Sequence, residues 1–304
     1  MSCTTCTARP VFRLAENNRP LCGRCFISWF ESKVSATIKS YSLISKGQKV
    51  AVALSGGKDS SVLLALLAKL SRGQRVFSLA AIAVDEGIAG YREQTLAHAA
   101  ELCSALGIEL HTTAFKEAYG STLDELVRSK KARPCSACGV LRRALLNKTS
   151  RELGFDVLAT AHNADDEAQS LLMNTLRGSP ELNARLGPVS GVIAHSAFVR
   201  RIKPLYFLTN KEIRAYALLN GISPPFGECP YSEGSLRAAI RDWLDCQESV
   251  RPGLKRALIA GHLRGLAELR AAVRTKELAA CSSCGQAAGR AGMCAVCALL
   301  ARSN

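Results

Sequence analysis

The sequence predicts an α/β protein: a doubly wound parallel sheet flanked by two small four-cysteine modules and a basic helical segment. Apolar runs of strand length alternate with helical patterns through the middle of the chain, as βα units do when they assemble into a parallel sheet. Two closely spaced cysteine pairs stand near each end, outside these units. We therefore expect four regions, at 1–30, 31–232, 233–278 and 279–304.

The composition indicates a globular protein with a polyanionic partner. The 304 residues are 48% hydrophobic, enough for one sizeable core with appendages. The net charge of +15 favours a nucleic acid as partner, with an anionic membrane surface as the alternative. No long uncharged apolar run and no signal-peptide pattern occur, so we expect a cytoplasmic protein that does not contact a membrane.

The first 30 residues contain two cysteine pairs, Cys3-x-x-Cys6 and Cys22-x-x-Cys25. Four thiolates at this spacing suit a tetrahedral zinc site, in which the metal takes the place of a core. Disulfides or unrelated thiols are the alternatives, and a reducing compartment favours zinc over them. The surrounding arginines fit either a solvated surface or contact with a phosphate backbone, and they are Arg9, Arg13, Arg19 and Arg24.

A helix expected over 31–46 leads into the first strand of the sheet. That strand, 50–54, is an unbroken apolar run, and a Leu-rich helix follows the turn at 55–61. Glycines in such a turn let the backbone approach a ligand, and the amides at the start of the helix attract an anion. Lys58 adds positive charge, and the serines add hydroxyl donors. The turn therefore predicts a phosphate cradle, with a ligand-free turn as the alternative.

The turn is not a Walker A loop, because Val52 stands where that motif needs its first glycine and Asp59 follows the lysine. Ser-Gly-Gly-Lys-Asp-Ser at 55–60 resembles instead the PP-loop of the N-type ATP pyrophosphatases, which cleave ATP between the α and β phosphates. The resemblance implies an ATP site made by Ala53, Leu54, Ser55, Gly56, Gly57, Lys58, Asp59 and Ser60.

Further βα units follow the cradle. Strands are expected at 77–84, 108–115, 156–162 and 199–205, and helices at 91–107, 122–129, 165–176 and 211–219. Ligands of such sheets bind at the carboxyl ends of the strands, so Asp85 and His162 should lie on the same edge as the cradle. We expect the adenine against the strand end that contains Val84. The Gly-, Pro- and Ser-rich stretch 178–192 predicts a mobile loop.

Two adjacent acids, Asp165 and Asp166, stand just after a strand end and His162. At the start of a helix such acids can cap the helix, hold Mg²⁺ between phosphates, or act as a base. Capping accounts for one of them, and their place beside the cradle favours a role in the ATP site for the other.

A central cysteine pair, Cys135-x-x-Cys138, has a distant third partner in Cys229. Three thiolates are one short of a structural zinc site, whereas an iron–sulfur cluster held by three leaves one iron open. Persulfide and disulfide exchange between Cys138 and Cys229 is the competing chemistry, with thiolates of low pKa beside Arg142 and Arg143. The basic segment 130–134 should be exposed, which argues against simple core thiols.

The two remaining isolated cysteines, Cys103 and Cys246, are expected to be small core residues. Residues 234–278 are helical in pattern and strongly basic. The cations there are Arg237, Arg241, Lys255, Arg256, Arg264, Arg270 and Arg274. The tail then repeats the opening motif and predicts a second zinc site, formed by Cys281, Cys284, Cys294 and Cys297.

Taken in order, the two cysteine modules, the PP-loop, Cys-x-x-Cys-Gly-Val-x-Arg-Arg, His-Asn-Ala-Asp-Asp and Glu-Cys-x-Tyr resemble one family over essentially the whole chain. It is that of the tRNA 2-thiouridine synthetases of the TtuA and cytosolic tRNA 2-thiolation protein group. The resemblance implies adenylation of the C2 oxygen of a tRNA uridine by ATP with Mg²⁺. Sulfur from a thiocarboxylated ubiquitin-like carrier protein then replaces that oxygen. A homodimer or a partner subunit is also compatible with the sequence.

The family further implies an oxygen-sensitive 4Fe-4S cluster on Cys135, Cys138 and Cys229. Its reactive positions correspond here to Lys58, Asp59, Arg142, Arg143, Asp165 and Asp166. T-loop enzymes of this family carry Lys-Arg where this chain has Arg-Arg, which favours the wobble uridine at position 34 over position 54. Arginine keeps the charge of lysine but does not transfer a proton as lysine can.

Three other functions remain alternatives at this stage. A disulfide couple without a cluster would use the same ATP chemistry. An amidating or lysidine-forming PP-loop enzyme would need neither the central cysteine pair nor the two terminal modules. A zinc-ribbon RNA-binding adaptor would have a vestigial ATP site, and the intact Lys58 and Asp59 argue against it.

Overall fold

A six-stranded sheet forms the centre of the computed structural model, in the order β5-β4-β3-β6-β8-β7. The structure describes residues 2–74, 76–129, 134–190, 195–224, 227, 229–232, 234–273, 279–288 and 292–301. The strands are β3 (Lys49–Ala53), β4 (Ser78–Asp85), β5 (Glu109–Ala114), β6 (Val157–Ala159), β7 (Val189–Ser190) and β8 (Arg200–Ile202). All neighbours pair in parallel except β7 and β8, so the mostly parallel sheet predicted from the sequence is confirmed.

Alternation along the strands gives the sheet two covered faces. Val50 and Val52 pack into the main core with helices α2 (Lys58–Gln74), α3 (Arg92–Leu106) and α9 (Asn210–Leu219). Ala51 and Leu158 point the other way, toward α6 (Pro134–Glu152). Successive side chains of a strand leave on opposite faces, so apolar residues at every position, as in 50–54, indicate a strand that is buried on both sides.

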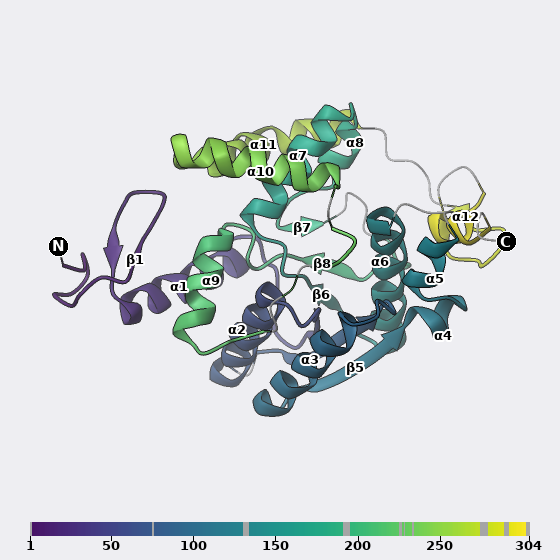
Figure 1. Ribbon diagram of the computed structural model, residues 1–304, viewed down its shortest axis with the longest axis horizontal. Helices are drawn as coiled ribbons and strands as arrows, with labels where there is room; N and C mark the ends of the chain where they lie inside the picture. The colour runs from purple at the N-terminus through teal and green to yellow at the C-terminus, as the bar shows by residue number, and fades with distance from the viewer. Residues whose placement is uncertain are drawn as a thin grey trace.

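The basic segment folds as two helices, α10 (Leu236–Val250) and α11 (Leu254–Ala272), which pack on α7 (Ala164–Leu176). Ile240, Leu244 and Ile259 form an apolar cluster with buried Tyr206 beneath them. Figure 1 shows α10 and α11 together with α7 and α8 (Pro180–Asn183) along one side of the sheet. This packing brings part of the basic segment to the edge of the sheet where the strands end.

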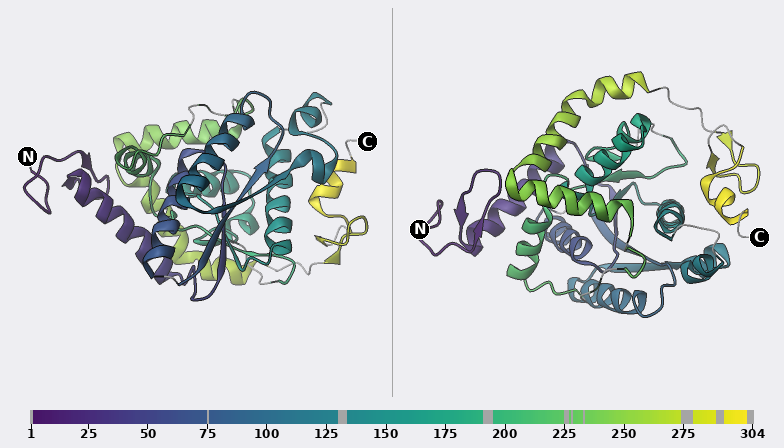
Figure 2. Two further views of the ribbon diagram at one scale, coloured as in Figure 1. Left: turned by 90° about the horizontal axis from the view of Figure 1, so that it is seen from below. Right: turned by 45° about the horizontal axis from the view of Figure 1, so that its top comes forward.

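The two cysteine modules lie at opposite ends of the molecule, as Figures 1 and 2 both show. The first comprises β1 (Phe12–Arg13), β2 (Pro20–Leu21) and the start of α1 (Gly23–Ser40), and it adds Leu14 and Leu21 to the main core. The second comprises β9 (Ala279–Ala280), β10 (Ala287–Ala288) and α12 (Ala295–Ala301). It has a small cluster of its own, and α12 packs against α6.

Some sequence-based expectations need correction. The helix expected over 31–46 begins at Gly23 and ends at Ser40, because the last cysteine pair of the first module opens that helix. The stretch 178–192 contains α8 and β7 rather than only a loop, and its last residues lie outside the described ones. Helix α6 was not predicted. Two short helices, α4 (Phe115–Tyr119) and α5 (Leu123–Arg128), complete this region.

The two isolated cysteines have different surroundings. Cys103 is buried in α3, as expected, and burial raises the pKa of its thiol to about 11. Cys246 is exposed, so the expectation that it is a core residue was wrong. Helix α10 buries Ile240 and Leu244, and a residue two positions beyond Leu244 points to the other side of a helix. Among the described residues, no helix is long and apolar enough to cross a membrane.

Candidate active site

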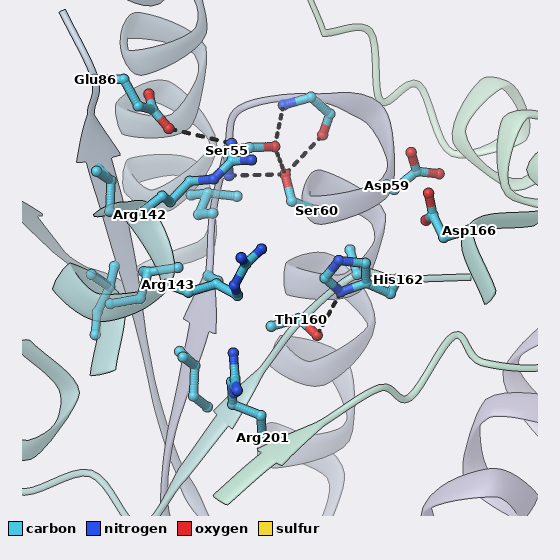
Figure 3. A pocket seen from close by; sticks show the side chains of 18 of the residues that line it. Ser55, Asp59, Ser60, Glu86, Arg142, Arg143, Thr160, His162, Asp166 and Arg201 are labelled. Carbon is cyan, nitrogen blue, oxygen red and sulfur yellow. Dashed lines mark hydrogen bonds and ion pairs between the residues drawn. The ribbon is translucent and has the colours of Figure 1, made fainter. Parts of the chain in front are cut away.

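A cavity of about 380 Å³ opens at the carboxyl ends of β3, β4 and β6, on the face of the sheet that α6 covers. Its apolar wall contains Ala53, Ile82, Val84 and Leu158, which share that face by strand alternation. Its polar wall contains the turn at 55–60 and side chains from α6, α7 and α10 (Figure 3). The volume is in the range of pockets that hold small ligands.

The turn between β3 and α2 is organised by its own serines. Ser55 Oγ lies 2.9 Å from Ser60 Oγ, and Ser60 Oγ donates a hydrogen bond to the carbonyl of Gly57 at 3.0 Å. Gly56 has φ +78°, and a Cβ there would lie 1.9 Å from the carbonyl oxygen of Thr95. Only glycine fits that position, so the predicted phosphate cradle has a fixed backbone at the start of α2.

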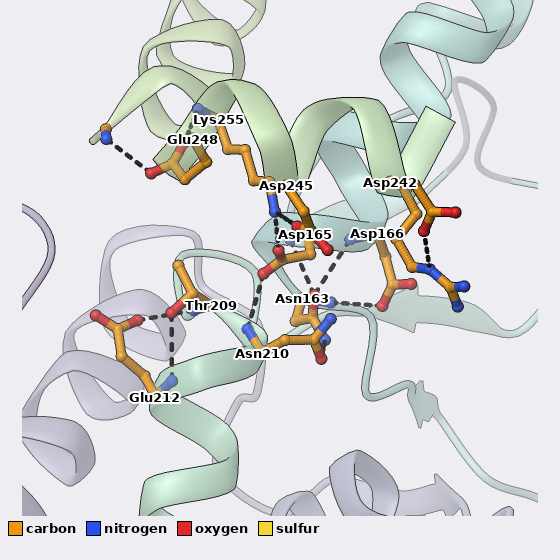
Figure 4. A network of polar contacts seen from close by, with 12 residues as sticks. Asn163, Asp165, Asp166, Thr209, Asn210, Glu212, Asp242, Asp245, Glu248 and Lys255 are labelled. Atoms are coloured by element: carbon orange, nitrogen blue, oxygen red, sulfur yellow. Dashed lines mark hydrogen bonds and ion pairs between the residues drawn. The ribbon is translucent and has the colours of Figure 1, made fainter. Parts of the chain in front are cut away.

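Lys58 of the cradle contacts a network that extends to the basic helices. Figure 4 shows the part of this network around Asp165, Asn210 and Lys255. Lys58 Nζ lies 2.5 Å from Asp59 Oδ1 and 3.3 Å from Asn210 Oδ1. The amide of Asn210 donates to Asp165 Oδ2 at 2.7 Å, and Lys255 Nζ of α11 donates to Asp165 Oδ1 at 2.5 Å. The network therefore connects the cradle to α11 through Asn210 and Asp165.

The adjacent acids of α7 have different surroundings. Asp165 is buried, is bonded to Lys255 and Asn210, and does not line the cavity. Asp166 lines the cavity together with Asp59, accepts a bond from the amide of Asn163 at 3.2 Å, and pairs with Arg237 at 3.3 Å. Burial raises the pKa of Asp166 to about 6, and the negative charge of Asp59 adds to that rise. Of the two adjacent acids, Asp166 is thus the one that faces a ligand, together with Asp59 of the cradle.

His162 and Asp85, the two other residues predicted at this edge of the sheet, have different surroundings. His162 lines the cavity, and its Nδ1 lies 3.0 Å from Thr160 Oγ1. The surrounding protein, together with cations that include Lys203 and Arg237, lowers the pKa of His162 to about 3, so the ring is neutral near pH 7. The carboxylate of Asp85 instead accepts the amide of Gly87 at 2.8 Å, in a turn after β4.

A buried carboxylate that the sequence analysis did not single out supports this wall of the cavity. Glu86 pairs with Arg92 at 2.8 Å and with Arg142 at 3.3 Å. Arg92 also donates to the carbonyls of Val84 at 2.7 Å and Ser55 at 2.6 Å. Arg92 therefore joins the ends of β3 and β4, and Glu86 orients Arg142 of α6 toward the cradle.

The three central cysteines are brought together at the start of α6. Cys135 is exposed, as expected, and its Sγ donates to the carbonyl of Tyr231 at 3.1 Å. Cys138 is buried in an apolar cluster against which Cys229 and Tyr231 pack. The segment 130–133 and residue 228 lie outside the described residues.

Cys138 and Cys229 do not have the low pKa that the alternative of disulfide exchange expects beside the arginines. Burial raises the pKa of Cys138 to about 11, although Arg142 opposes the rise. Burial also raises the pKa of Cys229. The expectation was wrong because the apolar cluster disfavours the thiolate more than one nearby guanidinium favours it.

Both predicted four-cysteine groups have their sulfur atoms gathered, within 4.8 Å of one another. In the first, Cys6 Sγ lies 3.6 Å from Cys22 Sγ and 3.7 Å from Cys25 Sγ. In the second group, Cys284 Sγ lies 3.6 Å from Cys294 Sγ. Tetrahedral zinc, with Zn–S bonds of about 2.3 Å, separates its sulfur ligands by about 3.8 Å. The cysteines present therefore fit a metal at both places.

Several cations of the basic segment serve the protein itself. Lys255 is buried against Asp165 and Asp245, so its charge is not available to a polyanionic partner. Arg256 pairs with Glu212 at 2.6 Å, and Arg270 donates to backbone carbonyls near α8. Arg237 reaches the cavity. Arg274 lies outside the described residues.

The fold and the cradle define a class of protein, and the comparisons agree: a family described as PP-loop domain matches residues 28–244. The chain is 35% identical to the tRNA-5-methyluridine(54) 2-sulfurtransferase of Pyrococcus horikoshii, over 93% of this chain and 89% of that one. It is 36% identical to the cytoplasmic tRNA 2-thiolation protein 1 of Bos taurus, over 95% and 84%. The chain belongs to this family of PP-loop tRNA 2-sulfurtransferases.

A solved structure in the same family has a similar fold. It is the U34-tRNA thiolase NcsA from Methanococcus maripaludis with its [4Fe-4S] cluster, which matches with a TM-score of 0.86 and 34% identity. The match covers 98% of this chain and 95% of that one. The resemblance that the sequence motifs indicated is thereby confirmed for the chain as a whole.

Proposed function

We propose that this protein thiolates a tRNA uridine at C2, by adenylation of the C2 oxygen followed by sulfur transfer. One observation carries the proposal: the cradle, the Asp59–Asp166 pair and the cysteine-bearing helix α6 all meet at one cavity. Family membership supports tRNA as the substrate, since the relatives are named tRNA 2-sulfurtransferases and tRNA 2-thiolation proteins.

The cradle binds the phosphates of ATP, and the apolar wall at Ala53, Ile82 and Val84 receives the adenine. The amides at the start of α2 and the side chain of Lys58 neutralise the β and γ phosphates. Asp59 and Asp166 face the same space and offer the carboxylate oxygens that Mg²⁺ prefers. Mg²⁺ held there would withdraw negative charge from the phosphates and favour loss of pyrophosphate.

In the first step the C2 oxygen of the uridine attacks the α phosphorus of ATP. A bond forms between that oxygen and phosphorus, the bond to the bridging oxygen breaks, and pyrophosphate leaves. Arg142, oriented by Glu86, stabilises the negative charge that develops on the α phosphate. His162 is neutral and adds no charge to the site.

In the second step water cleaves the carbonyl–sulfur bond of the carrier, which leaves as a carboxylate, and the released hydrosulfide attacks C2. The C2–S bond forms, the C2–O bond breaks as AMP leaves with the oxygen, and the proton on sulfur is lost to solvent. Activation as AMP divides a difficult displacement into two easier steps. Cys135, Cys138 and Cys229 fit a 4Fe-4S cluster, since Cys135 bonds to Tyr231 and both Cys229 and Tyr231 pack against the apolar cluster that contains Cys138. Such a cluster supplies an open iron that can bind sulfur. A thiocarboxylated ubiquitin-like carrier is the proposed sulfur donor.

The remaining regions support the substrate. Zinc at Cys3, Cys6, Cys22 and Cys25, and again at Cys281, Cys284, Cys294 and Cys297, would fix the two modules. With the exposed part of the basic segment 233–278, we propose that they hold tRNA around the catalytic region 31–232. The modules themselves are proposed to span 1–30 and 279–304. A homodimer or partner subunit and a cytoplasmic location are also proposals.

We further propose that the uridine modified is the wobble uridine. The Arg142–Arg143 pair and the match to the U34-tRNA thiolase support position 34. Position 54 is the second candidate, supported by the relative from Pyrococcus horikoshii. Incubation of the protein with ATP, a sulfur source and either wild-type tRNA, U34C tRNA or U54C tRNA decides between them. Loss of 2-thiouridine by mass spectrometry only with U34C is the expected result, and loss only with U54C would contradict it.

A further inference from the structure

The cavity contains a second concentration of positive charge, on Arg143 of α6 and Arg201 of β8. Figure 3 shows both guanidinium groups directed into the cavity, with Arg201 on the side away from Ser55 and Ser60 and Arg143 between Arg201 and these serines. Strand β8 pairs with β6 so that Arg201 stands opposite Leu158, whose side chain faces α6. This register places Arg201 on the cavity side of the sheet.

The other charged side chains that line the cavity each have an oppositely charged partner in the chain. Three carboxylates line the cavity, and each is already paired: Asp59 with Lys58, Glu86 with Arg92 and Arg142, and Asp166 with Arg237. Neither the Arg143 nor the Arg201 side chain has an ion pair or hydrogen bond with any residue of the described ranges. Their two positive charges remain without a counter-charge from the described part of the chain.

This arrangement is unfavourable in the free protein. Partial removal from water lowers the pKa of Arg143, and the charges of Arg201 and Arg142 lower it further. Burial also lowers the pKa of Arg201. Gly139 keeps the space for the Arg143 side chain, because a Cβ there would lie 3.0 Å from Arg143 Nη1. Two arginines held close together without a counter-charge destabilise the fold unless an anion joins them, which is typical of a binding site.

We propose that Arg143 and Arg201 form a phosphate subsite that binds a phosphodiester of the RNA substrate beside the uridine to be modified. This inference rests on the proposed function. The planar guanidinium groups match the geometry of a phosphate, and Arg143 is exposed enough to be reached by a polyanion. The phosphates of ATP already have the cradle and the start of α2, which lie on the other side of the cavity.

The spacing along α6 supports this assignment. Arg142 follows Cys138 by one helical turn, and Arg143 follows it by one residue more. A turn of helix rises about 5.4 Å, so the two arginines lie between one and two turns along α6 from Cys138. A phosphate held by Arg143 is therefore close to Arg142, on the same helix as the cysteine pair.

The chain offers a matched control on the same strand. Arg200 adjoins Arg201 but points to the opposite face, where it donates to the carbonyls of Leu43 at 2.8 Å and Ser42 at 2.9 Å. The experiment compares full-length, anaerobically purified wild type, Arg201→Met and Arg200→Met. Equilibrium binding of an unmodified tRNA transcript is measured over a range of salt concentrations, and binding of a non-hydrolysable ATP analogue is measured separately.

We expect Arg201→Met to weaken tRNA binding roughly 10- to 100-fold, the range for loss of a hydrogen bond to a charged group. The slope of log K against log salt should fall by about 1, as for one lost phosphate contact. Its affinity for the ATP analogue should stay within about twofold of wild type, and Arg200→Met should change neither affinity. If Arg201→Met binds tRNA as Arg200→Met does, the subsite does not exist.

Two further outcomes separate the possible errors. If Arg201→Met loses affinity for the ATP analogue and keeps its affinity for tRNA, the anion is a phosphate of ATP and the RNA assignment is overturned. If wild type itself binds no tRNA, the proposed function fails, and the inference fails with it. Thermal unfolding adds a readout that a structural role would not give. We expect Arg201→Met to melt at or above the wild-type temperature and Arg200→Met below it, and a lower melting temperature for Arg201→Met would contradict the inference.

Discussion

The two sides of the cavity differ in how completely their polar groups are satisfied. On the cradle side, Ser55, Ser60, Lys58 and Asp165 all have partners within the chain, and the backbone is fixed by a glycine. On the side formed by α6 and β8, the side chains of Arg143 and Arg201 line the cavity without a partner among the described residues, and α6 also contains Cys138, whose thiol has a raised pKa. The difference indicates that the cradle is ready for ATP, whereas the α6 side is completed by groups that the chain does not supply.

The largest effect is expected at the buried ion pair between Lys255 and Asp165, which supports the cradle side of the cavity. Lys255→Met removes the cation from buried Asp165, and an unpaired buried charge costs about 3–5 kcal/mol. Urea unfolding should show a loss of that size in the free energy of unfolding. The double variant Asp165→Asn/Lys255→Met removes both charges and should recover most of the loss. A single variant within about 1 kcal/mol of wild type would show that the network does not hold the cradle side.

The fixed backbone of the cradle gives the next largest effect. Gly56→Ala combines a left-handed backbone with overlap against the carbonyl of Thr95, which together cost about 2–4 kcal/mol of the free energy of unfolding. Gly47→Ala is the matched control, since Gly47 has φ +82° and no atom within 4 Å of an added Cβ. It should cost only about 1–2 kcal/mol. The affinity for ATP, measured by calorimetry, should fall in Gly56→Ala and stay unchanged in Gly47→Ala. Equal losses of stability and of ATP affinity in the two variants would show that contact with Thr95 does not restrict position 56.

The protonation of Asp166 should make the free energy of unfolding of the protein depend on pH. Its pKa is raised from 3.8 to about 6, so between these values the folded state binds more protons than the unfolded state. The free energy of unfolding should therefore fall as pH rises from about 4 to about 6, by about 1–3 kcal/mol. Asp166→Asn should remove this fall, and urea unfolding without ATP or Mg²⁺ measures it. If Asp166→Asn keeps the pH dependence of the wild type, a group other than Asp166 causes it.

The local part of this account could be predicted from the sequence. The strand, the cradle and the four-cysteine groups are each encoded in a short stretch, so residues 50–61 sufficed to place the phosphate site at the start of a helix. The sequence could not separate Asp165 from Asp166, which are adjacent and chemically the same. Only the packing of α11 on α7 decides that Lys255 neutralises the first and that the second faces the cavity.

The remaining residues of the site depend on tertiary structure. Glu86, Arg92 and Arg201 belong to no motif, and they reach the cavity because of strand register and the crossing of α3 and α6 over the sheet. The position of Glu86 directly after a strand end was a usable signal, since ligands bind at that edge. Arg237 was noted only as one cation of the basic segment, and the structure shows that it lines the cavity and pairs with Asp166.

The central claim is that Cys135, Cys138 and Cys229 complete the α6 side with an iron–sulfur cluster. Iron, sulfide and zinc analysis after anaerobic purification tests it most directly, on wild type, Cys229→Ala and, as a matched control, Cys246→Ala, which removes an exposed cysteine outside the three groups. We expect about four irons with equal sulfide and about two zincs per chain in wild type and in Cys246→Ala. Cys229→Ala should lose the iron and keep the zinc. Zinc without iron in wild type, even after anaerobic reconstitution, would contradict the cluster and leave disulfide exchange between Cys138 and Cys229 as the route for sulfur.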